Sequence, residues 1–188
     1  VFRPESRQSV QDVAVFDNEI LIVVSDNVVG TLKRFTFERD GRPIWSSVDF
    51  GVPSNSAIGI GDRSRGSSRA FVSAQGFLTP PTLSLADMSA ATLTVLRQAP
   101  PKFDASTHVT EQFEARSSDG TMIPYFVTRP RDMAMDGSAP TILFGYGGFQ
   151  VSFPPAYKPE MGKLWLETGG VFVQATIRGG GAFGPQWP

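Results

Sequence analysis

The chain has 188 residues, of which 40% are hydrophobic and 19% charged, with a formal net charge of −1. This composition is typical of a globular protein and argues against a disordered one. A near-neutral charge gives no electrostatic basis for binding nucleic acid or an anionic membrane, and no apolar run approaches the roughly 20 residues that span a bilayer. The chain has no cysteine and one histidine, His108, so disulfides, thiolate sites and polyhistidine metal sites are excluded within it. We therefore expect neither a metal nor a cofactor.

The first part of the chain, residues 1–108, is predicted to form short strands separated by turns. Asp40-Gly41 is a hairpin-type turn that leads to Ile44 and Trp45. About four strands recur in each of two segments of about 45 residues, the length of one propeller blade. A piece of a β-sandwich is the alternative. The remaining predicted strands cover residues 19–25, 33–38, 56–60, 69–73, 82–85 and 92–96.

The pattern changes after Pro100-Pro101, because neither proline can donate a hydrogen bond to a sheet. Alternating residues from Phe113 predict a strand up to the Asp119-Gly120 turn, and residues 123–129 form the returning strand. Ser117, Ser118, Asp119 and Asp136 are interpreted as turn residues. His108 precedes these strands and is interpreted as a linker or surface histidine.

An α/β unit is predicted for the last third. The apolar run 141–144 suits a strand buried on both faces. A helix is expected over 159–167, with Pro159 in its first turn, an apolar face of Met161, Leu164 and Trp165, and Gly169 as its cap. Residues 171–177 form a second buried strand, parallel to the first. If the sheet is incomplete, an unpaired edge beside 171–177 invites association.

Two glycine clusters follow these two apolar strands. The first is Gly145-Tyr146-Gly147-Gly148-Phe149, and the second contains Arg178-Gly179-Gly180-Gly181. Glycine tolerates positive φ and has no Cβ, so such clusters can bring backbone close to a bound substrate. A loop after a buried strand is where α/β-hydrolases place oxyanion donors, and the phenol of Tyr146 is a suitable donor. Phe149 would add an apolar wall. A plain glycine turn with a core tyrosine is the equal alternative.

A nucleotide-binding interpretation of the second cluster is weaker. Gly179, Gly181 and Gly184 satisfy the spacing G-x-G-x-x-G after a strand, which is the dinucleotide fingerprint in outline. Pro185 follows directly, however, and no helical pattern is visible. Arg63, Arg65 and Arg69 lie in a glycine- and serine-rich segment and are interpreted as a solvated loop, with carboxylate binding as the minority alternative.

Three blocks, at residues 117–126, 145–149 and 177–184, resemble the start of the peptidase domain of prolyl oligopeptidases, which are serine peptidases of the α/β-hydrolase fold. Residues 76–82 resemble a segment in the late blades of the propeller of that family. The resemblance implies that residues 1–108 are C-terminal blades of a β-propeller. It also implies that residues 109–188 are the truncated start of an α/β-hydrolase domain, so that the chain is a fragment of a two-domain protein.

The resemblance assigns roles to two side chains. Tyr146 matches the tyrosine that helps to bind the oxyanion, and Phe149 matches an aromatic residue in the pocket for the substrate proline. Two positions depart from the family pattern. Phe144 stands where many members have tyrosine, and Ala182 stands where many have glutamate. If that glutamate pairs with the arginine that matches Arg178, the partner must come from elsewhere in this chain.

The resemblance also implies groups that the sequence lacks. The serine nucleophile of the family sits in a G-x-S-x-G elbow, followed by an aspartate and a histidine. No such elbow occurs in the 188 residues, so we expect the chain alone to be inactive. The implied partners are short proline-containing peptides and the remainder of the peptidase domain, with no nucleic acid or membrane. A non-enzymatic β-rich binding module is the competing function, and the sequence does not separate a cytoplasmic from a periplasmic location.

Overall fold

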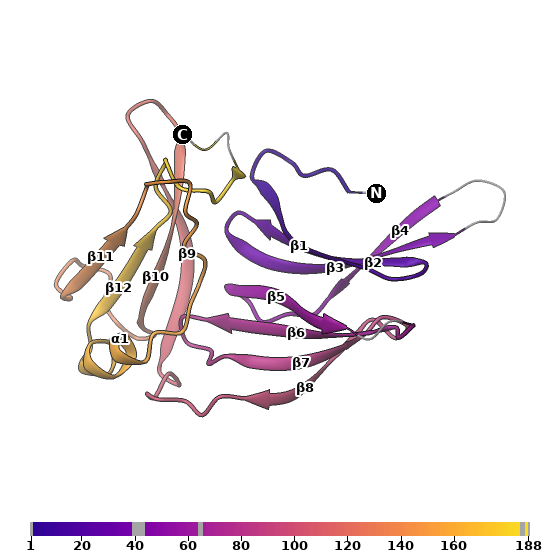
Figure 1. Cartoon of the computed structure of the whole chain (residues 1–188). Helices are drawn as coiled ribbons and strands as arrows, with labels where there is room; N and C mark the ends of the chain where they lie inside the picture. Colours follow the sequence, from indigo (N-terminus) through magenta and orange to yellow (C-terminus); the bar gives the residue numbers. More distant parts are fainter. Residues whose placement is uncertain (1, 39–43, 64–65, 185–186, 188) are drawn as a thin grey trace.

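The computed structural model describes residues 2–38, 44–63, 66–184 and 187, and these form three four-stranded sheets (Figure 1). The first sheet is an antiparallel meander, and the second repeats that order. Consecutive four-stranded meanders are the arrangement of propeller blades. The strands of the first sheet are β1 (Gln8–Val15), β2 (Glu19–Asp26), β3 (Val29–Glu38) and β4 (Ile44–Phe50), and those of the second are β5 (Ser56–Arg63), β6 (Arg69–Gly76), β7 (Thr82–Asp87) and β8 (Thr92–Gln98).

Every strand predicted for this region is confirmed, but β1 was not named by the sequence pattern. Its sequence mixes polar and apolar residues, and a register shift between Val10 and Asp12 breaks the two-residue alternation. The shift has a structural use, because the Asp12 carboxylate accepts a hydrogen bond from the backbone N–H of Ile60 on β5, at 3.0 Å. The expected turn at Asp40-Gly41 lies outside the described residues.

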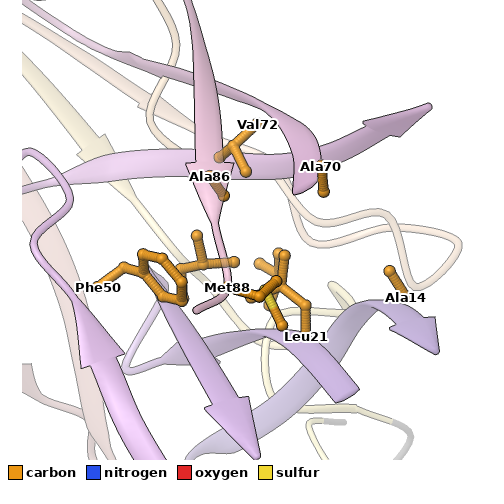
Figure 2. Close-up of a cluster of buried hydrophobic side chains, with 9 residues drawn as sticks. Ala14, Leu21, Phe50, Ala70, Val72, Ala86 and Met88 are labelled. Carbon is orange, nitrogen blue, oxygen red and sulfur yellow. The ribbon is translucent and has the colours of Figure 1, made fainter. Parts of the chain in front are cut away.

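A hydrophobic core joins the first two sheets. Figure 2 shows Leu21 and Phe50 of the first sheet facing Val72 and Ala86 of the second, with Met88 beside Leu21. All five side chains are buried. Burial of such side chains, each worth about 1.5–3 kcal/mol for the larger ones, is the main force holding the two sheets together.

The closeness of these two sheets depends on Gly30 in β3. A Cβ added there would lie 2.8 Å from Cγ1 of Ile58 and 2.8 Å from the carbonyl oxygen of Ser56. We expect Gly30→Ala to lower the free energy of unfolding by about 1–3 kcal/mol, because overpacking forces the sheets apart. Gly51→Ala is the matched control, since nothing lies within 4 Å of its Cβ position. The midpoint of thermal unfolding would fall for Gly30→Ala alone, and equal midpoints for the two variants would contradict this packing.

The third sheet is mixed, with the strand order β11-β12-β10-β9. β9 (His108–Arg116) and β10 (Met122–Pro130) form an antiparallel hairpin, as the sequence predicts. β11 (Thr141–Gly145) and β12 (Val171–Ala175) are parallel, and the chain between them carries a helix. The predicted unit of strand, glycine loop, helix and strand is therefore confirmed.

Two expectations about this sheet are wrong. β11 is an edge strand and not a buried one, and Leu143 on it is 71% exposed. β12 is not beside an unpaired edge, because it lies between β11 and β10. The sequence predicts the strands but not their order, and here the later strand occupies the inner position. The exposed parallel edge is therefore that of β11.

The predicted helix is shorter than expected. It consists of α1 (Pro159–Leu164), followed by the 3-10 turn η1 (Leu166–Thr168). The backbone leaves helical geometry at Trp165, whose indole N–H donates to the carbonyl oxygen of Val171 at 2.9 Å. Leu164 consequently points outward and is 73% exposed, so its assignment to the apolar face was wrong.

The two ends of this helical segment agree better with the sequence. Pro159 lies in the first turn of α1, and Gly169 caps η1 in the left-handed region with φ of 90°.

No helix among the described residues is long and apolar enough to cross a membrane.

The third sheet packs against the ends of the first two (Figure 1). Val28, in the turn between β2 and β3, and Phe77, directly after β6, share a core with Phe126 and Phe172 of the third sheet, and the ring centroids of Phe77 and Phe126 are 5.3 Å apart. Asn55 adds a polar link by donating from its side-chain amide to the carbonyl oxygen of Thr110 at 2.9 Å. The ends of the meanders and the third sheet therefore share a second hydrophobic core, separate from the one between the first two sheets.

His108 lies inside this junction, so its assignment as a linker or surface residue was wrong. It is the first residue of β9, is buried, and places Nε2 3.0 Å from the carbonyl oxygen of Leu166. Thr107 Oγ1 lies 3.3 Å from Nδ1. The imidazole thus connects the hairpin to η1 and has a structural role.

Candidate functional site

The parallel pairing of β11 and β12 brings the two glycine clusters together. Gly145 and Ala175 are register partners at the carboxyl ends of the two strands, so the loops that follow start side by side. In α/β sheets, ligands bind at the carboxyl ends of the strands. The candidate site is therefore this edge of the third sheet.

Tyr146 is held at the start of the first loop. Its ring packs edge-on against Phe153, with centroids 5.3 Å apart, and the side chain remains 38% exposed. Its hydroxyl oxygen lies over Gly148, where an added Cβ would be 3.1 Å away. None of the described residues forms a hydrogen bond with this hydroxyl, so the phenol can donate to a ligand at the surface.

Phe149 follows in an unusual backbone conformation. It has φ of 53°, and Gln150 has φ of 55°, both in the left-handed region that non-glycine residues rarely adopt. The Phe149 ring is 94% exposed, so the described residues supply no opposite wall to a cleft. Strained backbone of this kind costs about 1–3 kcal/mol and is typical of functional loops.

The second glycine loop interlocks with the first through backbone contacts. Gln150 N–H donates to the carbonyl oxygen of Gly179 at 3.0 Å. A Cβ at Gly147 would overlap the carbonyl oxygen of Arg178, and a Cβ at Gly181 would overlap that of Gln150. These glycines thus bring two protein backbones together, which the sequence interpretation, based on a bound substrate, did not predict.

Gly180 makes the same kind of approach. A Cβ added there would lie 3.0 Å from the carbonyl oxygen of Val151. Gly145, in contrast, has only ordinary contacts at its Cβ position. The requirement for glycine therefore comes mainly from the positions where the two loops touch.

Arg178 projects from the second loop to the turn between β9 and β10. Its guanidinium forms an ion pair with Asp119, and Nη2 donates to Ser117 Oγ at 3.1 Å. The sequence interpretation of Ser117 and Asp119 as turn residues alone is therefore incomplete. The acidic partner of Arg178 comes from 59 residues earlier in the chain, a separation at which no local sequence signal could reveal it.

Asp119 also stabilises its own turn. Its carboxylate accepts a hydrogen bond from the backbone N–H of Thr121 at 3.0 Å. This bond, followed by the hydrogen bond from Arg178, lowers the pKa of Asp119 from 3.8 to about 2. The carboxylate is thus ionised throughout the neutral range and remains available to Arg178.

Ala182 stands where many members of the family that the sequence resembles have glutamate. It is buried, with an exposed fraction of 1%. Its carbonyl oxygen accepts a hydrogen bond from Ser9 Oγ on β1 at 3.3 Å. The neighbouring Phe183 ring lies 5.1 Å below the guanidinium carbon of Arg7, which is also paired with Glu114. The second glycine loop therefore contacts the first meander as well as the first loop (Figure 1).

The dinucleotide interpretation gains no support from the geometry. Residues 178–183 form turns and bends, and no α-helix follows Gly179 and Gly181 among the described residues. The glycine spacing is already explained by the contacts with Gly147 and Gln150. No group of three or more histidine, aspartate or glutamate side chains is placed to hold a metal ion in the described part of the chain.

The other candidates stay apart from this edge. Arg63 lies over the ring of Phe16 at 5.5 Å, and Arg69 pairs with Asp87 at 3.3 Å. Arg65 lies outside the described residues. Asp136 accepts a hydrogen bond from the Ser138 N–H at 3.0 Å, as expected of a turn residue.

Comparison with known proteins gives independent evidence on the family of this chain. The chain is 40% identical over 187 residues to an uncharacterized peptidase of Sinorhizobium fredii, a match covering all of this chain and 25% of that protein. It is 36% identical over 117 residues to a prolyl endopeptidase of Elizabethkingia meningoseptica, covering 62% of this chain and 16% of that protein. The solved structure of a post-proline cleaving enzyme from Rickettsia typhi matches all of this chain and 27% of its own, with a TM-score of 0.81 and 33% identity.

The chain belongs to the prolyl oligopeptidase family. It spans about a quarter of the length of the curated relatives that match all of it. The fold matches about a quarter of the length of solved prolyl oligopeptidases, including one from Galerina marginata bound to a 35mer hydrolysis and macrocyclization substrate, with a TM-score of 0.81 and 27% identity over 98% of this chain and 26% of that one. No family model matches the chain.

Proposed function

We propose that the chain is part of a serine peptidase that cleaves short peptides after proline by acyl transfer. Residues 1–108 are assigned to the last blades of a propeller, and residues 109–188 to the start of an α/β-hydrolase peptidase domain. The observation that carries this proposal is the pair of interlocked glycine loops at the carboxyl edge of β11 and β12, with Tyr146 exposed there, in a chain with peptidase relatives.

Tyr146 is proposed to stabilise the tetrahedral intermediate. Its O–H donates to the oxyanion that forms when the nucleophile attacks the scissile carbonyl. Packing against Phe153 fixes the ring, and its 38% exposure leaves the hydroxyl accessible. A neutral donor fixed before the reaction starts stabilises the developing charge without first having to reorganise.

Phe149 is proposed to bind the proline ring of the substrate. A pyrrolidine ring is flat and apolar and packs well on an aromatic face. The exposed ring of Phe149 and its left-handed backbone support this role, because both are unfavourable unless a ligand or further protein covers the ring.

The remaining groups are assigned to residues outside this chain. A serine would attack, a histidine would accept its proton, and an aspartate would orient the histidine. The exposed edge of β11, with Ile142 and Leu143 at the surface, is the proposed place where the rest of the domain continues the sheet. The 188 residues alone are therefore proposed to lack catalysis.

The test is hydrolysis of two chromogenic substrates by the full protein that contains this chain. We expect a Gly-Pro anilide to be cleaved about 10–200-fold more efficiently, in kcat/KM, than the matched Gly-Ala anilide, because the pocket gains only the ring contacts. The isolated 188 residues should give no turnover above buffer. Equal rates on both substrates would contradict the proline specificity, and peptide binding without hydrolysis would favour the binding module.

A further inference from the structure

We propose that Asp119 and Arg178 are a positioning pair that holds the two glycine loops, and through them Tyr146, in the geometry for catalysis. The inference rests on the proposed peptidase function. It assigns a role to two residues that touch neither the substrate nor the reacting atoms.

The turn between β9 and β10 is a rigid anchor for this pair. Ser117 N–H donates to the carbonyl oxygen of Thr121 at 2.8 Å, and Gly120 N–H donates to that of Ser117 at 2.9 Å. Asp119 is fixed in addition by the backbone N–H of Thr121. The turn therefore presents its carboxylate and the Ser117 hydroxyl in one fixed arrangement, and the planar guanidinium of Arg178 bonds both.

The backbone of Arg178 carries this restraint to the first loop. Its carbonyl oxygen lies directly against Gly147, with no room for a Cβ between them. The next carbonyl, that of Gly179, accepts the hydrogen bond from Gln150. Gly147 and Gln150 flank Gly148 and Phe149, and Tyr146 directly precedes Gly147. A shift of Arg178 would consequently move the proposed oxyanion donor and the proposed proline-binding ring together.

The exposure of the pair argues against a role in stability alone. The side chains of Arg178 and Asp119 are 38% and 48% exposed. Exposed ion pairs contribute little to folding, because solvent screens them. Catalysis is more sensitive, since a misplacement of about 1 Å can cost about 100-fold in rate. A positioning role thus predicts a loss in kcat without a matching loss in stability.

The chain offers a close control for the test. Asp136 accepts a hydrogen bond from the backbone N–H two residues on, as Asp119 does. Among the described residues, however, its side chain bonds only within its own turn, to Ser138. Asp119→Asn keeps an oxygen that can accept from Thr121, removes the charge, and replaces the oxygen that faces Arg178 by an NH2 group that cannot accept a hydrogen bond. Asp136→Asn makes the same chemical change away from the loops.

We expect Asp119→Asn in the full protein to lower kcat about 10–100-fold with KM changed less than about threefold. Its thermal midpoint should match that of Asp136→Asn, which should keep the kcat of the unaltered protein. Asp119→Glu, which restores the charge, should recover most of the lost kcat. In hydrogen exchange followed by mass spectrometry, peptides covering residues 147–151 and 179–181 should exchange faster in Asp119→Asn alone.

The outcomes separate this inference from the proposed function. If the unaltered protein has no peptidase activity, the proposed function fails and the exchange of the two loops decides whether the pair positions them. If the unaltered protein is active and Asp119→Asn equals it in kcat and in loop exchange, the positioning role is overturned. The positioning role would also be overturned if Asp119→Asn alone lowered the thermal midpoint together with kcat, and if Asp119→Glu did not restore kcat.

Discussion

Replacing Tyr146 by phenylalanine is expected to lower kcat of the full protein by about 100–1,000-fold, the effect of removing one oxyanion donor. The substitution leaves the ring against Phe153 and removes only the hydroxyl. Because the oxyanion exists only in the transition state, KM should stay close to its original value. Steady-state kinetics on the Gly-Pro anilide measures both constants.

Tyr125→Phe is the matched control for this prediction. Tyr125 lies on β10, where it is the register partner of Ala175, and its ring stacks on Phe113 with centroids 5.8 Å apart. Loss of its hydroxyl should leave kcat unchanged. A Tyr146→Phe protein with the kcat of the Tyr125→Phe protein would show that the phenol does not stabilise the transition state.

The second large effect is expected from Phe126→Ala. Phe126 is fully buried on β10, and its ring packs against Phe77, directly after β6. Truncating a buried phenylalanine typically lowers the free energy of unfolding by about 3–5 kcal/mol, because apolar contacts are lost and a cavity remains. The cavity would lie in the core shared by the third sheet and the meanders, so both should lose stability together.

Chemical denaturation, followed by far-ultraviolet circular dichroism, tests this prediction. Phe113→Ala is the control, because Phe113 is 38% exposed on the adjacent strand and its truncation should cost far less. If Phe126→Ala were no more destabilising than Phe113→Ala, the shared core would not be a main source of stability.

Much of the strand pattern could be predicted from the sequence. The β-branched run of β2 and the alternation in β7 are local signals that burial on a sheet reinforces, whereas the alternation in β8 predicts a strand that is mostly exposed. β1 was missed because its register shift and polar residues hide the alternation. The order of the third sheet could not be predicted, because it depends on which strand pairs with β10 and not on any single segment. This is why β11 was expected to be buried and lies at the edge.

The candidate site was predicted in outline. Glycines after two parallel strands located both loops, since the carboxyl ends of such strands share one edge of a sheet. The partners that tie the loops down were not predictable from local pattern. Arg178 reaches Asp119 across 59 residues, and His108 reaches Leu166 across 58. Such contacts follow from the folded geometry alone.

The most direct test of the proposed peptidase is to find the nucleophile. The full protein would be treated with a fluorophosphonate, which modifies activated serines, and the labelled peptide would be identified by mass spectrometry. We expect one modified serine in a G-x-S-x-G sequence that follows Pro188 in the chain, and no modification of Ser117 or Ser118. No labelled serine, or a label within residues 1–188, would contradict the assignment of this chain to a serine peptidase.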